Sequence, residues 1–216
     1  MFRYYALSAL CIVYMADIPR ERSFAAESPG IVNSSGFDES RWHTRGWTLQ
    51  ELIAPRNVVF MTWIWKVIGT RHQLADKLQT ITGIPASVLR HEVDIADTSI
   101  AQRMSWASSR STTREEDGAY CLFGIFGIHM PTLYGEGRNA FYRLQEEIMR
   151  TSSDTSLFAW GNGFSVNGVL CLASALQRTH GSSSQGHLFA TSPICFPKQR
   201  FVRALGPDNR RVSSLS

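Results

Sequence analysis

The sequence predicts a mixed α/β chain: two short strands separated by a helix, then a helical stretch, then a small β-rich appendage. Residues 11–15 and 57–63 are rich in β-branched and aromatic side chains and are bounded by turn-forming residues, as strands are. Between residues 70 and 150, apolar residues recur every three to four positions, which is the spacing of helices. Beyond residue 151 the composition shifts toward Ser and Gly.

Composition excludes a disordered chain and argues against a nucleic-acid partner. The 216 residues are 44% hydrophobic and 19% charged, which suffices for a sizeable core. The net charge of +4 comes from the carboxy-terminal part, where six basic residues face the single acid Asp208: Arg178, Lys198, Arg200, Arg203, Arg210 and Arg211. No arginine–aromatic repeat accompanies them. We expect a solvated, disordered basic tail over residues 197–216.

The cysteines and the apolar segments predict no metal, disulfide framework or membrane anchor. The cysteines lack CxxC spacing and a neighbouring His ligand; they are Cys11, Cys121, Cys171 and Cys195. The apolar stretch 9–16 makes a poor signal peptide, and no other run approaches the ~20 residues of a membrane span. We expect a cytoplasmic protein with no metal, no cofactor and no membrane contact.

Start and stop signals place the first elements. Residues 1–9 resemble the end of a helix, and residues 19–40 form a loop. A short helix begins near Trp47 and must end at Pro55, because proline lacks the amide proton and clashes with the preceding turn.

The later helices follow the same logic. Thr70 and Gln73 form a capping-box pair ahead of a helix that ends at Gly83. Further helices are expected over 99–107, after a second capping-box pair of Thr113 and Glu116, and along an apolar stripe at Ala140, Phe141, Leu144 and Ile148.

We divide the chain into a first domain of residues 1–150, a small β-rich accessory domain of residues 151–196, and the tail. Within the accessory domain, residues 157–160 have the apolar character of a strand.

The Trp47 helix carries the candidate catalytic residue. At ~100° per residue its aliphatic side chains, Leu49, Leu52 and Ile53, share one face, and its opposite face carries Trp47, Gln50, Glu51 and Ala54. A carboxylate beside an indole is partly withdrawn from water, and enzymes use such withdrawal to tune catalytic acids. The alternative is that Glu51 is solvated, or pairs with Arg45 or Arg41.

Two other motifs are assigned structural roles. The loop Tyr134-Gly135-Glu136-Gly137 resembles a phosphate cradle only superficially, because Glu136 would repel an anion. The string Thr112-Thr113-Arg114-Glu115-Glu116-Asp117 is explained by helix capping and by acids in a first helical turn, with Arg103, Arg110 and Arg114 as possible ion-pair partners.

Several long strings, in order, resemble the fungal heterokaryon-incompatibility (HET) domain over roughly residues 1–160. They are Ser40-Arg41-Trp42, Arg45-Gly46-Trp47-Thr48-Leu49-Gln50-Glu51-Leu52, Ala101-Gln102-Arg103-Met104-Ser105-Trp106-Ala107, Tyr120-Cys121-Leu122-Phe123-Gly124 and Met130-Pro131-Thr132-Leu133-Tyr134-Gly135-Glu136-Gly137. The segment after residue 154 resembles part of the small uncharacterised domain that often follows HET domains. Family members usually carry a further strand ahead of the first residues here, so the resemblance implies an amino-terminally truncated domain.

The resemblance implies allorecognition: HET proteins trigger programmed death of mixed fungal cells. It also implies a partial flavodoxin-like, TIR-like parallel sheet. Glu51 then falls where NAD-cleaving TIR domains keep their catalytic glutamate, with NAD as substrate, Trp47 stacking on a ring and Arg45 meeting a phosphate. Because the implied pocket is incomplete, we expect this chain to be inactive.

Two other interpretations stay open. In the first, the domain is a non-enzymatic module that signals by homo-oligomerisation or by binding other recognition proteins. In the second, the chain is an inactive remnant. A pocket lined by Glu51 and Trp47 favours the enzyme, whereas an exposed apolar face away from Glu51 favours assembly.

Overall fold

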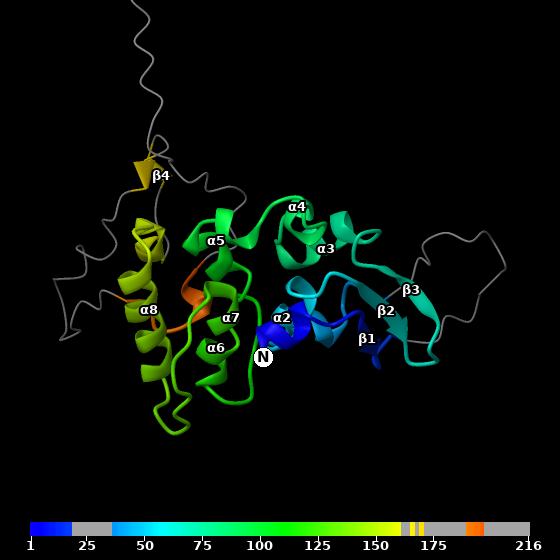
Figure 1. The fold of residues 1–216 in the computed structure, drawn as a ribbon, viewed down its shortest axis with the longest axis horizontal. Helices are drawn as coiled ribbons and strands as arrows, with labels where there is room; N and C mark the ends of the chain where they lie inside the picture. The colour runs from blue at the N-terminus through cyan, green and yellow to red at the C-terminus, as the bar shows by residue number, and fades with distance from the viewer. Residues whose placement is uncertain (19–35, 161–164, 167–168, 171–188, 197–216) are drawn as a thin grey trace, which may run out of the picture.

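A three-stranded sheet forms one end of the molecule and a set of helices forms the other (Figure 1). The structure is a computed structural model that describes residues 1–18, 36–160, 165–166, 169–170 and 189–196. The sheet has the order β1-β2-β3 and consists of β1 (Cys11–Met15), β2 (Val58–Thr62) and β3 (Val67–Thr70). Strands β1 and β2 are parallel, and β2 and β3 are antiparallel.

The helices near the sheet and those beyond it are short, apart from the last. The α-helices are α1 (Phe2–Ala6), α2 (Thr48–Ile53), α3 (Ala75–Thr82), α4 (Ala86–Leu89), α5 (Ile100–Ser105), α6 (Asp117–Tyr120), α7 (Phe123–Phe126) and α8 (Asn139–Thr151). Four 3₁₀ turns accompany them among the described residues: Arg41–Thr44, Ile95–Asp97, Thr155–Phe158 and Pro193–Cys195. Figure 1 shows α2 beside the sheet, α3 and α4 above α2, and α5 to α8 on the side away from the sheet.

The sheet has one buried and one exposed face. Along β1, Val13 and Met15 are buried whereas Ile12 and Tyr14 are exposed, because successive strand residues point to opposite faces. Phe60 of β2 is buried on the same side as Val13 and Met15. One face of the sheet therefore packs on the core and the other carries apolar groups into solvent.

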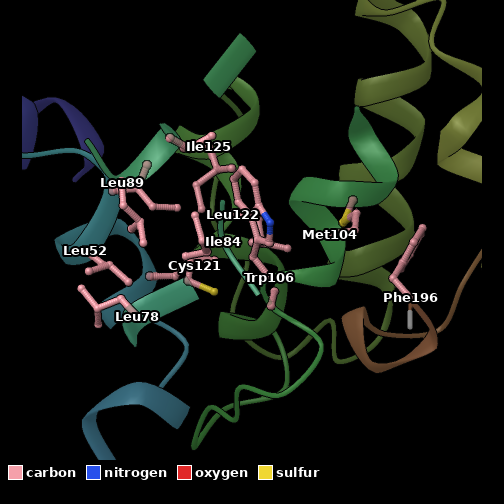
Figure 2. Close-up of a cluster of buried hydrophobic side chains, with 14 of the residues drawn as sticks. Leu52, Leu78, Ile84, Leu89, Met104, Trp106, Cys121, Leu122, Ile125 and Phe196 are labelled. Carbon is pink, nitrogen blue, oxygen red and sulfur yellow. The ribbon is translucent and has the colours of Figure 1, made fainter. Parts of the chain in front are cut away.

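A single buried cluster joins the sheet to the helical end. It runs from Leu52 of α2 and Leu78 of α3, through Trp106 and Leu122, to the helical end near Met104 (Figure 2). Trp106 is 1% exposed, and Leu52, Leu78, Leu122 and Met104 are completely buried, so the two ends share one core.

Several sequence-based predictions about helix ends are confirmed. The amide of Thr70 donates to Gln73 Oε1 (2.9 Å) and the amide of Gln73 donates to Thr70 Oγ1 (3.3 Å), which is the reciprocal pairing of a capping box. Gly83 ends α3 in the left-handed conformation, at φ 76°. Helix α2 stops just before Pro55, as the missing proline amide requires.

Two predictions are wrong, and one strand was not predicted. Residues 155–158 form a 3₁₀ turn rather than the start of a strand, because the Asp154 carboxylate accepts from the Ser156 amide (2.9 Å) and fixes a helical start. Strand β3 was not expected, because residues 67–70 are too few to show alternation. Thr113 and Glu116 form no capping box: Glu116 caps α6 without a side-chain hydrogen bond to it.

The appendage lies mostly outside the described residues. Ser165–Val166 (β4) and Val169–Leu170 (β5) pair antiparallel, whereas residues 171–188, the tail 197–216 and most of the loop expected at 19–40 are not described. Residues 189–196 return to the helical end, where the Gln145 side chain exchanges two hydrogen bonds with the backbone of Ala190, at 2.8 and 2.9 Å.

Within the described ranges, no helix is both long and apolar enough to cross a bilayer, and no three His, Cys, Asp or Glu side chains gather as metal ligands would. Cys11, Cys121 and Cys195 are free thiols.

His43 is buried between aromatic rings under the sheet. It is 5% exposed, its Nε2 lies 2.9 Å from the Phe37 carbonyl, and its ring meets Phe37 and Trp42 edge to face. Nε2 therefore carries the proton, and a second proton on Nδ1 would have no acceptor among the described residues. Burial lowers the pKa of His43 to about 4.

This depressed pKa predicts acid-sensitive folding. The contribution of neutral His43 to the free energy of unfolding is fully present above the unfolded-state pKa near 6.5. It is lost as the pH falls toward 4, which lowers the free energy of unfolding by about 3 kcal/mol. In His43→Gln, which keeps a donor for the Phe37 carbonyl, the unfolding free energy should fall less steeply over that range. Urea denaturation at several pH values measures both profiles. Identical slopes would show that His43 titrates normally.

Candidate functional site

Glu51 is half-buried on α2, and its hydrogen-bond partner is a residue that the sequence did not suggest. The Tyr5 hydroxyl of α1 donates to Glu51 Oε1 at 3.2 Å. Glu51 forms no ion pair with Arg45 or Arg41 in the described structure, and Arg41 instead lies 3.8 Å from the Asp17 carboxylate. Glu51 is therefore neither fully solvated nor neutralised by either arginine named as its alternative partner.

The predicted division of α2 into two faces is only partly correct. Leu49, Leu52 and Ile53 are buried as expected, but Gln50 is also buried, at 1% exposure, although it was placed on the open face. Its Nε2 donates to the Cys121 carbonyl at 2.5 Å, because α6 and α7 pack on that side. Glu51 and Trp47 keep partial exposure, one turn apart. The open part of α2 is thus a narrow strip.

Trp47 and Arg45 lie at the amino-terminal end of α2. Trp47 is the N-cap residue and is half-buried against the core. The Arg45 side chain is exposed, while its carbonyl accepts hydrogen bonds from Thr48 Oγ1 (2.8 Å) and Arg110 Nη1 (2.9 Å). The structure therefore brings the three predicted site residues to one helix and its entry turn, without a direct hydrogen bond among them.

Two guanidinium groups hold the ends of α2. At the carboxy-terminal end, buried Arg71 donates to the carbonyls of Leu52 (2.7 Å), Ile53 (3.2 Å) and Arg56 (2.9 Å). This position also suits the negative end of the helix dipole. Burial lowers the pKa of Arg71 to about 10, which leaves it charged at neutral pH.

At the other end, Arg110 donates to the Arg45 carbonyl and to Thr48 Oγ1 (2.8 Å), and not to the acids of the 115–117 string as the sequence suggested. Burial lowers its pKa to about 10, while the nearby Cys121 thiol and Glu51 carboxylate act in the opposite direction. Its Nη2 atom is shielded from solvent and has no hydrogen-bond partner among the described residues.

A phenol, a thiol and a guanidinium group lie near the Glu51 carboxylate: those of Tyr5, Cys11 and Arg110. Burial, and then the Glu51 charge, raise the pKa of Tyr5 to about 12, so the phenol keeps its proton and acts as a donor. The same two causes raise the pKa of the Cys11 thiol. A carboxylate close to a phenol, a thiol and a buried cation can stabilise positive charge on a bound molecule. No sequence signal marked Tyr5 or Arg71, and Arg110 was assigned different partners, because each of the three acts through the fold and not through a motif.

The loop Tyr134-Gly135-Glu136-Gly137, which resembles a phosphate cradle only superficially, binds a carboxylate of the chain itself. The amides of Gly135 and Gly137 donate to Glu116 Oε1 at 2.7 and 3.1 Å. Hydrogen bonds from the backbone amides of Glu116 itself, then of Gly135 and Gly137, lower the pKa of the Glu116 carboxyl. Gly135 has a φ of 104° and Gly137 a φ of 56°, values that glycine adopts without strain.

A second network of hydrogen bonds fastens the same loop. Glu136 accepts from Arg143 Nη1 (2.7 Å to Oε2) and from the Tyr120 hydroxyl (2.8 Å), which in turn accepts from the Leu133 amide. The strings around residues 112–117 and 130–137 therefore form one structural unit, and their residues are explained by it.

Comparisons with known proteins connect the chain to fungal incompatibility. It is 45% identical over 149 residues to the vegetative incompatibility protein HET-E-1 of Podospora anserina, which is 68% of this chain but 11% of that protein. The chain thus matches only about a tenth of its relative's length. Residues 139–215 match a domain of unknown function, DUF8212. No solved structure matches the chain.

The Glu116 contacts predict a specific local loss. In Glu116→Ala the Gly135 and Gly137 amides lose their acceptor, so their hydrogen exchange should accelerate, whereas Glu116→Gln keeps an oxygen and should retain most of the protection. Exchange measured by NMR compares the two variants, with Glu146→Ala as an exposed control on α8. Equal protection in all three proteins would show that Glu116 does not hold the loop.

Proposed function

We propose that this chain acts in fungal vegetative incompatibility as a HET-type signalling domain. The observation that carries the proposal is its 45% identity to the Podospora vegetative incompatibility protein over 149 residues. The strings by which the chain resembles HET domains are also explained by one connected core and loop network, as expected of a domain that folds around them.

We further propose that Glu51 serves NAD cleavage in complete relatives. The reaction breaks the bond between nicotinamide and the ribose C1′ atom, water supplies the new oxygen, and the products are nicotinamide, ADP-ribose and a proton. Neutral nicotinamide departs with the electron pair of that bond, so no strong general acid is needed. Positive charge develops on the ribose, and a carboxylate placed beside it lowers the barrier.

The geometry of α2 supports this role. Glu51 is half-exposed on a helix whose two ends are fixed by Arg71 and Arg110, and catalysis requires such fixed placement. Half-buried Trp47 offers an aromatic wall one turn away, and the exposed Arg45 side chain offers a cation for a phosphate.

A second candidate function is assembly, which the exposed face of the sheet favours. We define the outer sheet face as Ile12, Tyr14, Trp63, Ile64, Trp65 and Val67, which are 41–63% exposed. The rings of Tyr14 and Trp65 lie 5.1 Å apart, and the Tyr14 hydroxyl donates to the Trp63 carbonyl at 3.0 Å. This face lies opposite the side of the sheet that buries Val13 and Phe60, so a partner there would leave Glu51 untouched.

One experiment separates the two candidates. The segment of the Podospora relative that matches this chain is replaced by the chain's own segment, and cell death and NAD content are measured after induction. The chimera should kill. Glu51→Gln should slow NAD loss about 100-fold and abolish killing, whereas Glu92→Gln, at an exposed position, should change neither.

The other outcomes decide against one part or all of the proposal. If the Glu51→Gln chimera kills cells while their NAD content stays undiminished, the NAD-cleavage proposal is overturned. If the double variant Trp63→Ser, Trp65→Ser then no longer kills, that result favours assembly. A chimera that accumulates in the cell but never kills would contradict the incompatibility function itself.

A further inference from the structure

Helix α1 is attached to the molecule unusually lightly. None of its five residues is buried: Tyr4 is 81% exposed, and the flanking residues Met1 and Leu7 are 68% and 74% exposed. Isolated helices of this length are not stable in water, so α1 depends on its contacts with the body. Those contacts are with α2 and α7, and Figure 1 shows α1 lying in front of α2.

The first attachment is Phe2, which lies directly on Gly124 of α7. A Cβ atom built on Gly124 would lie 2.1 Å from the Phe2 Cβ and 2.6 Å from its Cγ. Any side chain at position 124 would therefore push Phe2 away, and the glycine provides the seat for the phenyl ring. The contact is half-buried, so it holds α1 without joining it to the deep core.

The second attachment is the hydrogen bond from Tyr5 to Glu51 Oε1. Tyr5 lies one turn after Phe2, so both side chains point from the same side of α1 toward the body, while Tyr4 points outward. The phenol covers one oxygen of the carboxylate and occupies a lone pair that a substrate would otherwise use.

We propose that α1 is a strap that covers Glu51: Phe2 anchors it on Gly124, Tyr5 occupies the carboxylate, and release of α1 exposes that carboxylate to a ligand. This inference rests on the proposed role of Glu51 for its biological meaning. The strap itself is a property of the chain and is testable without any activity.

The test measures the reactivity of the Glu51 carboxylate in the full chain. A water-soluble carbodiimide and glycinamide convert accessible carboxylates to amides, and mass spectrometry of peptides gives the rate at each site. Exposed Glu92 is the internal reference. In the unmodified sequence Glu51 should react slowly relative to Glu92. Phe2→Ala and Gly124→Ala should each accelerate Glu51 roughly tenfold, because each removes the anchor by a different route.

Tyr5→Phe removes only the hydrogen bond, and it should accelerate Glu51 less than loss of the anchor does. Tyr4→Phe, on the exposed side of α1, is the matched control and should change nothing. Circular dichroism checks that each variant folds. If Gly124→Ala does not fold, Phe2→Ala still decides the test.

Two results would overturn the strap: Glu51 reacting as fast as Glu92 in the unmodified sequence, or an unchanged Glu51 rate in folded Phe2→Ala. Neither result bears on NAD cleavage, which the chimera tests separately. Conversely, an accelerated Glu51 rate together with undiminished killing by Glu51→Gln would leave the strap standing and the enzyme overturned.

Discussion

Two guanidinium groups, the buried one of Arg71 and the half-buried one of Arg110, hold the ends of α2 and are the constraint on which the rest of the structure depends. Helix α2 has only six residues and would not be stable alone. Arg71 satisfies carbonyls at its carboxy-terminal end, and Arg110 ties its entry turn to the helical end of the molecule. Neither guanidinium has a carboxylate within ion-pairing distance among the described residues, so backbone and hydroxyl oxygens take that role. The position of Glu51 follows from these two contacts.

Hydrogen bonds from side chains to backbone groups also stabilise the helical end of the molecule. In addition to packing in the shared core, the short helices there are joined by side chains that bind backbone groups: Glu116 binds two loop amides, and Gln145 binds the backbone of Ala190. Each such contact joins residues far apart in the sequence.

Local signals predicted the elements well and their environment poorly. The Thr70–Gln73 capping box, the stop at Pro55 and the α8 stripe depend only on neighbours within a turn, and all three are present. The burial of Gln50 and the partners of Arg110 and Glu116 depend on contacts across tens of residues, which spacing does not reveal. For the candidate site, the sequence predicted a face of α2 with Glu51 and Trp47, both of which are half-buried, but it did not predict Tyr5, which reaches Glu51 from 46 positions away.

Replacement of Arg71 by Met tests the account most directly, because Met fills similar space and donates no hydrogen bonds. Three carbonyls at the end of α2 would then lose their partner, so the unfolding free energy should fall by about 3 kcal/mol and the α2 amides should exchange faster. Arg56→Gln, at an exposed neighbouring side chain, is the control. An Arg71→Met protein as stable as the parent, with α2 equally protected, would contradict the account.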